Sequence, residues 1–285
     1  MPETYSAHEA KIYYIDEVTY GQTPSNPTML GIPAESIEPT LNPNNIKIRG
    51  VGSIDLQAIK KGLRAPSIKI AYPLSSDAPI NFLQYARAEL AKSLSLQVLY
   101  YKGVFSEATD IISLLYTGCK IQSTTVQCSI EDVVRASMEL LSQDVMSGTA
   151  KISGATYLDY GGAVPFYESY VKKDAATLER VTDWKFTIEN NLKQVPVIRS
   201  PNGNILKYLP YRYRDLTGEV VFEFESKEEF DDVISDREFA LEFGLGGAYK
   251  AVFSGCKWEN TQVPTRIEEL VSLKAAFVAK TVTIT

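Results

Sequence analysis

The sequence contains an internal repeat, and this feature restricts the possible fold more than any other. Residues 116–145 align without a gap on residues 253–282, at a constant offset of 137 positions, and nine of the thirty pairs are identical. Unrelated segments of ordinary composition would share about two. We therefore predict that the 285 residues form two copies of one unit, a first domain over residues 1–147 and a second over residues 148–285.

The repeat also decides the secondary structure of residues 130–145. Their composition alone favours a helix, because Glu, Ala, Met and Leu are good helix formers. The matching segment, residues 267–285, ends in a Thr-Val-Thr-Ile-Thr run that favours a strand. In both copies apolar residues recur at every second position, which is the period of a strand with one buried face. We therefore predict strands in both segments.

Each unit is predicted to be mainly β, a small barrel or sandwich of short strands with one flanking α-helix. The further predicted strands lie near residues 37 and 188, and at residues 46–49, 68–72, 94–100, 195–199, 220–224 and 239–243. The predicted helices cover residues 81–92, with Asp77 as a cap and Pro79 in the first turn, and residues 227–234. Turns are predicted at Gly50, Gly52 and Gly203.

Composition excludes several classes of function. The hydrophobic fraction of 45% and the charged fraction of 22% are typical of a foldable, soluble chain. A net charge of −6 without a Lys/Arg cluster argues against binding DNA by neutralising phosphates. No apolar run reaches the roughly 18 residues that a membrane span needs, and the first residues lack the apolar core of a signal peptide. We expect no membrane contact.

No catalytic, cofactor-binding or metal site is predicted. The single histidine, His8, precludes a multi-histidine metal site and would have to serve any histidine-dependent triad alone. The three cysteines form no Cys-x-x-Cys pair, which favours free thiols over a disulfide framework. Adjacent carboxylates such as Glu131 and Asp132 are more typical of surface charge than of a glycosidase. A carbohydrate-binding β-sandwich that uses Trp184 or Trp258 remains a less favoured alternative.

Two segments of the sequence resemble a known family. Residues 186–198 combine an apolar strand, a pair of asparagines and a second strand that enters a long hairpin, and residues 255–280 form a characteristic closing segment. The first copy contains less complete matches to these segments at residues 36–41 and 118–121. Together they resemble the tail tube proteins of long-tailed, siphophage-like viruses, a superfamily that includes the tubes of contractile injection machines. Some siphophage tubes fuse two such domains in one subunit.

The resemblance implies a structural function. Each domain would give four strands to an inner sheet, three chains would close a ring with pseudo-sixfold symmetry, and stacked rings would form a hollow tube. Double-stranded viral DNA would pass through without specific binding. The expected partners are further copies of the chain and the tape-measure, tail-terminator and baseplate proteins. The expected location is the virion tail, assembled in the host cytoplasm. A single-ring baseplate hub or tail-terminator protein of the same lineage is the alternative.

The resemblance also assigns candidate surface residues. On the strand at residues 220–224, Val220, Phe222 and Phe224 would face the core. The opposite face would line the channel or form a solvated outer face, with mixed charge; the candidates are Val221, Glu223, Glu225 and Lys69. Contacts between stacked rings would come from tyrosine-rich arms and hairpin turns. These candidates are Tyr13, Tyr14, Tyr20, Tyr157, Tyr160, Tyr167, Tyr170, Gly50, Gly52 and Gly203.

Overall fold

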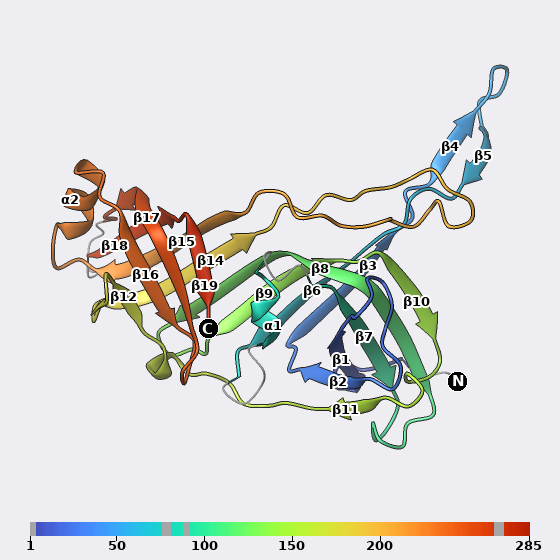
Figure 1. Cartoon of the computed structure of the whole chain (residues 1–285), viewed down its shortest axis with the longest axis horizontal. Coiled ribbons are helices and arrows are strands. Elements are labelled where there is room, and N and C mark those ends of the chain that lie inside the picture. Colours follow the sequence, from blue (N-terminus) through green and yellow to red (C-terminus); the bar gives the residue numbers. More distant parts are fainter. Residues whose placement is uncertain (1–3, 76–80, 88–91, 265–270) are drawn as a thin grey trace.

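The computed structural model describes residues 4–75, 81–87, 92–264 and 271–285 (Figure 1). The fold is mainly β, as predicted. The strands of the first half are β1 (Ala10–Asp16), β2 (Thr28–Ile32), β3 (Ser36–Asn42), β4 (Ile46–Arg49), β5 (Leu56–Lys60), β6 (Ala65–Pro73), β7 (Leu94–Tyr101), β8 (Ile111–Ser129), β9 (Arg135–Leu141) and β10 (Asp144–Gly148). Those of the second half are β11 (Thr156–Leu158), β12 (Val171–Lys173), β13 (Ala176–Thr177), β14 (Val181–Glu189), β15 (Asp215–Glu223), β16 (Phe239–Gly244), β17 (Lys250–Gln262), β18 (Ser272–Val278) and β19 (Thr281–Ile284).

One antiparallel sheet runs through the whole molecule. Its strand order is β3-β6-β9-β8-β14-β15-β18-β17. Side chains alternate between its two faces, and the residues of one face are almost all buried and apolar. The pairing of β8 with β14 joins the two halves of the chain, so the halves share a single sheet.

A second layer covers the apolar face of each half. In the first half it has the order β10-β8-β7-β1-β2, with β11 beside β2. In the second half it has the order β19-β17-β16-β12-β13. The long strands β8 and β17 therefore belong to both layers, which makes each half a sandwich whose layers share one strand.

Two glycines allow β8 and β17 to bend between layers. Gly118 has φ 63° and Gly255 has φ 64°, a region that residues with a Cβ rarely adopt. A Cβ on Gly118 would lie 2.7 Å from Cβ of Gln143, and one on Gly255 would lie 2.6 Å from Cδ of Lys280. Each strand thus bends at a position where conformation and space both require glycine.

Of the predicted strand at residues 130–145, β9 and β10 confirm the part from residue 135 on, whereas residues 130–134 form a turn. For its counterpart, β18 and β19 confirm the part from residue 272 on, and residues 267–270 lie outside the described residues. The predicted helices correspond to α1 (Asn81–Gln84) and α2 (Glu228–Ile234). The α2 prediction is nearly correct. The first helix ends much earlier than predicted, because the amides of residues 85–87 bond to carbonyls three residues back, as in a tightening final turn. Asp77 and Pro79 lie outside the described residues.

Two predictions about the second half are wrong. Residues 195–199 form no strand: Val195 makes one isolated bridge with Tyr208 in a long irregular segment, where Pro196 lacks the amide that a ladder needs. Phe224 is not in the core but is 40% exposed, one residue past the end of β15. In the sheet register Phe222 occupies the place of Tyr72 and Phe224 that of buried Leu74, so the exposure of Phe224 does not follow from the register.

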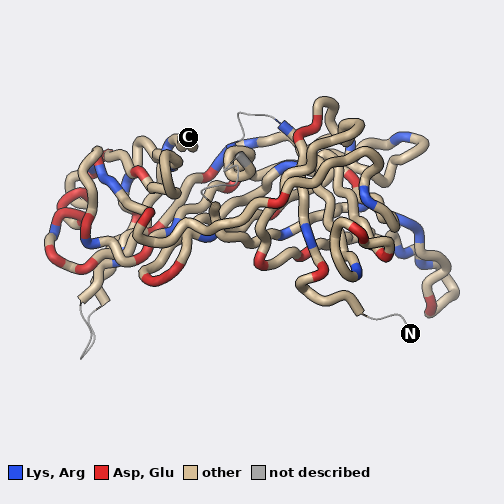
Figure 2. The backbone as a smooth tube through the Cα atoms, turned by 90° about the horizontal axis from the view of Figure 1, so that it is seen from below, with Lys and Arg blue, Asp and Glu red and all other residues tan. Residues whose placement is uncertain are grey.

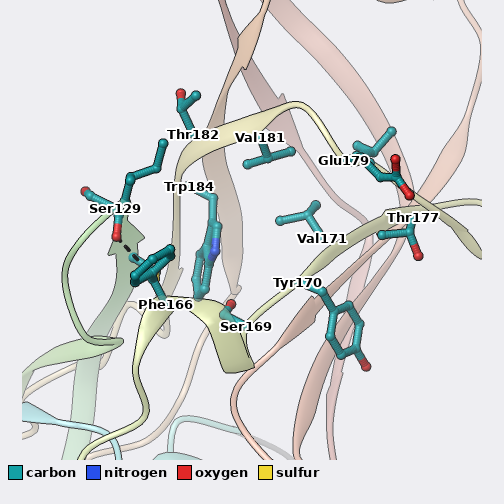
Figure 3. Close-up of a pocket in the computed structure, with 13 residues that line it drawn as sticks. Ser129, Phe166, Ser169, Tyr170, Val171, Thr177, Glu179, Val181, Thr182 and Trp184 are labelled. Carbon is teal, nitrogen blue, oxygen red and sulfur yellow. Dashed lines mark hydrogen bonds between the residues drawn. The ribbon is translucent and has the colours of Figure 1, made fainter.

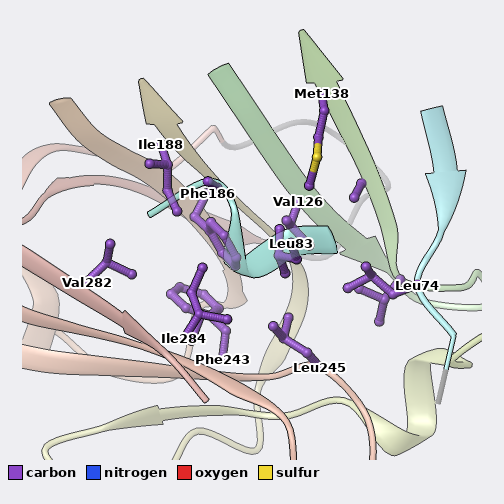
Figure 4. Packing of buried hydrophobic residues seen from close by; sticks show 14 of the residues in the cluster. Leu74, Leu83, Val126, Met138, Phe186, Ile188, Phe243, Leu245, Val282 and Ile284 are labelled. Atoms are coloured by element: carbon purple, nitrogen blue, oxygen red, sulfur yellow. The ribbon is translucent and has the colours of Figure 1, made fainter. Parts of the chain in front are cut away.

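The hydrophobic core continues across the joint between the halves. Figure 4 shows residues of the first half, such as Leu83 and Val126, beside Phe186 and Phe243 of the second. Rings of β14, β16 and β17 pack closely, with centroids 5.0 Å apart for Phe186 and Phe253. Burial of such large side chains supplies most of the free energy that holds the layers together.

Two long segments project from one end of the shared sheet (Figure 1). The first arm, residues 43–64, contains the β4–β5 hairpin, which pairs with no other described strand. The second arm, residues 191–214, connects β14 to β15. The amide of Arg64 donates to the carbonyl of Asn204 over 2.8 Å, so the arms touch near the base of the first.

Candidate assembly surfaces

The shared sheet ends in two edges that have no partner among the described strands. One is β3, and the other is the C-terminal part of β17. The strands β9, β6 and β3 correspond to β18, β15 and β14, because β9 and β18 are equivalent at an offset of 137 residues. When the paired residues are followed across each set of strands, Leu41 in β3 occupies the place of Ile188 in β14. Leu41 is 49% exposed, whereas Ile188 is fully buried. The difference arises because β8 and its layer cover β14, whereas Ile37 of β3 packs against the core and no described strand covers β3 at Leu41.

The face of the shared sheet away from the core is polar. Its charged residues alternate in sign: Lys69 lies 4.0 Å from Glu139, and Lys274 lies 2.8 Å from Glu219. The candidates Lys69 and Glu223 are exposed on this face, and Val221 is half-buried on it. Glu225 lies beyond the end of β15 instead. No second layer of the described chain covers this face, and its mixed charge agrees with the sequence-based expectation.

Two of the candidate tyrosines are buried and cannot contact another chain. Tyr13 and Tyr14 lie in β1, and each is at most 1% exposed. The Tyr13 hydroxyl donates to Asp159 over 2.6 Å, and burial together with this carboxylate raises its pKa. The Tyr14 ring packs 4.9 Å from that of Phe82. We therefore do not retain these two residues among the proposed contacts.

The other candidate tyrosines differ in exposure. Tyr20, Tyr157 and Tyr160 are half-buried, and the Tyr157 hydroxyl donates to Gln97 over 2.7 Å. Burial and a hydrogen bond to Glu242 raise the pKa of half-buried Tyr170 to about 12. Tyr167 is 74% exposed, and its ring makes an edge contact with that of Phe166, with centroids 5.7 Å apart.

The candidate glycines lie in the two arms. Gly50 and Gly52 form the turn of the β4–β5 hairpin, and Gly52 has φ 85°. Gly203 lies in the turn of the second arm, where a Cβ would approach the carbonyl oxygen of Arg199 to 2.5 Å. Sequence reasoning found these turns but missed the aliphatic side chains around them. The exposed ones are Ile46, Ile48, Val51, Ile54 and Ile59 in the first arm and Ile198 in the second.

A hollow of about 340 Å³ lies at the opposite end of the sheet (Figure 3). It opens where β8 ends and β14 begins, and its wall includes Trp184, Phe166 and Ile130. Ile130 is 53% exposed although it is aliphatic. The carboxylate of Glu179 lies at the same hollow. The sheet thus has projecting aliphatic tips at one end and, at the other, a depression lined by both apolar and polar side chains.

Comparison with known proteins identifies the family. The sequence matches the model of a family described as phage tail tube protein over residues 7–279, nearly its whole length. The chain belongs to the phage tail tube protein family. It is therefore a structural protein of tail-tube type and a component of a virion tail. None of the curated proteins compared matches the sequence significantly.

Two solved structures are similar to this tail tube family member. One is titled as the anti-feeding prophage cap, a tube-terminating cap, with 13% identity, a TM-score of 0.40 and coverage of 53% of this chain and 94% of that one. The other is titled as the anti-feeding prophage baseplate, with 13% identity, a TM-score of 0.36 and coverage of 53% and 99%.

The described residues of this tail tube family member contain no group of three His, Cys, Asp or Glu placed to hold a metal ion. All three cysteines are free and buried, and burial raises the pKa of Cys128 to about 11 and that of Cys256 to about 12. Such thiols remain protonated and unreactive near neutral pH. Among the described residues, no helix combines the length and apolarity needed to cross a bilayer.

Proposed function

We propose that this chain is the major subunit of the tail tube, and that three copies close into a pseudo-hexameric ring. The observation that supports this most is the pairing of β8 with β14. It joins two half-sheets edge to edge within one chain, and the same kind of edges, β17 and β3, stay open at the two ends. Pairing β17 of one chain with β3 of the next repeats the joint and leaves no free edge.

The proposal includes the duplication of one domain. Strands β9 and β18 begin and end 137 positions apart, and β10 and β19 also begin at this offset. The bends at Gly118 and Gly255 and the register shifts that follow them keep the same offset. These correspondences extend the sequence repeat into the geometry of the sheet, and they support six similar units in a ring of three chains.

The polar face of the shared sheet would line the channel. Eight strands from each of three chains, spaced about 4.8 Å apart, give a circumference that corresponds to a backbone diameter of roughly 37 Å or more. Such a barrel is wide enough to conduct a DNA duplex. A wall of mixed charge, with exposed carboxylates such as Glu223, would not hold phosphates firmly. The rings would stack into a tube that conducts viral DNA, assembled in the host cytoplasm with tape-measure, tail-terminator and baseplate proteins.

Electron microscopy of the purified protein tests the proposal. We expect hollow filaments, and native mass spectrometry of single rings should give three chains. Rings of six chains would mean that the second half does not contribute to the channel wall. Discrete rings that never stack would instead favour a terminator or hub protein, and monomers that bind glycans would favour a lectin.

Charge on the proposed channel wall affects DNA passage in a predictable way. Glu189→Lys combined with Glu223→Lys adds two cations to the polar face at exposed positions without a described ion-pair partner. We expect assembly to continue and DNA ejection from the particles to slow, because the wall would then attract phosphates. Ejection kinetics measured by dye release provide the test. An unchanged rate would show that this face does not line the channel.

A further inference from the structure

The two arms carry an excess of positive charge. The first arm, residues 43–64, contains five Lys or Arg and one Asp, and the second arm, residues 191–214, contains five Lys or Arg and no acidic residue. Arg49 and Lys207 are exposed and make no salt bridge within the described part of the chain. This charge is therefore available to a partner.

The opposite end of the shared sheet carries negative charge. Residues 223–238, which include α2, contain eight Asp or Glu and two Lys or Arg. In Figure 2 acidic positions gather along the tube at the end of the molecule that carries α2 in Figure 1, and Figure 1 places α2 and the first arm at opposite ends. Six of the eight form ion pairs within the chain, such as Glu229, which accepts from Arg180 over 2.6 Å, and Glu223 and Glu225 are the two without a described ion pair. Glu225 and Glu179 are exposed and have no described cation beside them.

The same two ends differ in apolar shape. Val51 and Ile54 at the tip of the first arm and Ile198 in the second are almost completely exposed. At the acidic end, the hollow offers apolar side chains, among them Ile130 and Trp184, together with polar ones that include Glu179. Exposed aliphatic side chains of this kind indicate a surface that is buried in a complex.

We propose that the acidic end binds the basic arms of a second copy of this chain, so that the arms of one ring dock on the acidic end of the next. This inference rests on the proposed tube function and gives the stacking contact its chemistry. Because the two surfaces differ and lie at opposite ends, the contact is heterologous and repeats without limit. Charge attraction orients the arms, and aliphatic tips fill the hollow.

A nucleic acid is the other possible partner of basic arms, but two observations favour a second chain. The complementary acidic surface is present on the same molecule, and the exposed tips are aliphatic rather than polar. Contacts to phosphates would use the cations alone and leave these tips in water.

Salt gives the first test. Backbone hydrogen bonds between strands close each ring, whereas charge pairs hold the stack, and the Debye length falls from about 10 Å at 0.1 M to about 3 Å at 1 M salt. We expect the mean tube length, measured by electron microscopy, to fall at least about tenfold at 1 M salt while rings remain.

Charge reversal gives the decisive test. One variant, Arg49→Glu with Lys207→Glu, reverses two exposed cations of the arms, and another, Glu179→Lys with Glu225→Lys, reverses two exposed carboxylates of the acidic end. Each alone should form rings that do not stack. Mixing preformed rings of the two variants should restore tubes, because the introduced carboxylates of one variant then meet the introduced cations of the other. The control, Lys69→Glu with Lys185→Glu, changes the same number of cations between the two ends and should form tubes alone.

The outcomes separate this inference from the proposed function. Tubes that persist at 1 M salt and in both variants would overturn the charged contact. Wild-type rings that never stack would also overturn it, as would a mixture of the two variants that remains as single rings. A third contrary result would be an arm variant that loses DNA binding but still stacks. Absence of rings from the wild-type protein would refute the proposed function instead.

Discussion

A chain carrying Thr40→Cys and Gln262→Cys is expected to form covalently closed trimers under oxidising conditions. Within the chain, Thr187 in β14 and Thr125 in β8 lie opposite each other, with their hydroxyl oxygens 2.9 Å apart. Counted from β9 and β18, Thr40 occupies the place of Thr187, and Gln262 occupies that of Thr125. If the joint between chains repeats the joint within the chain, these two side chains meet at the ring interface.

Electrophoresis without reductant measures the result, which should be a ladder of one, two and three chains with the closed trimer dominant. The matched control is Thr40→Cys with Asn260→Cys, which faces the same side but lies two residues out of register. Such a pair is too distant for a disulfide without backbone movement. The natural cysteines are buried and should not contribute. Equal cross-linking of both pairs, or none of the predicted pair in assembled rings, would disprove the register.

The sequence contained enough information for the mainly β fold because its repeat could be compared with itself. Helix propensity at residues 130–145 was overruled by the strand period that both copies share, and β9 and β18 agree with that choice. The same comparison failed where the copies diverge. Residues 195–199 were predicted as a strand like residues 46–49, yet β4 pairs with β5, whereas residues 195–199 make one isolated bridge and pair with no described strand. The local hydrophobic pattern of a segment does not show which distant segment it pairs with.

The candidate surfaces were harder to predict than the fold. Tyrosine-rich segments suggested arms, but Tyr13 alternates with Ile12 and Tyr14 inside a strand that is covered on both faces. Burial on both faces of β1 depends on what packs against it, which the sequence of β1 does not contain. The arms themselves were detectable only through Gly50, Gly52 and Gly203. Their aliphatic residues look like core residues in the sequence, and only the structure places them in solvent.

Ile188→Ala is expected to destabilise the isolated chain, and Leu41→Ala is expected to weaken the assembled ring. The two residues occupy the same place in their half-sheets. Ile188 is fully buried beneath the first half, so its truncation should destabilise the isolated chain by about 2–5 kcal/mol. For a chain of this size such a loss lowers the melting temperature by roughly 5–15 °C. Leu41 is already 49% exposed, so its truncation should cost the isolated chain less than about 1 kcal/mol.

In the assembled ring, the truncation of Leu41 should cost more free energy than it does in the isolated chain. When β17 of a neighbouring chain covers β3, Leu41 becomes buried as Ile188 is, and its truncation then removes contact area at each of the three joints. Calorimetry of the monomer and sedimentation of the rings measure the two effects separately. A Leu41→Ala protein that melts normally but dissociates at higher concentration than wild type would place β3 in the ring joint. Unchanged ring stability would mean that β3 remains an open edge, because a side chain that becomes buried on assembly must contribute to it.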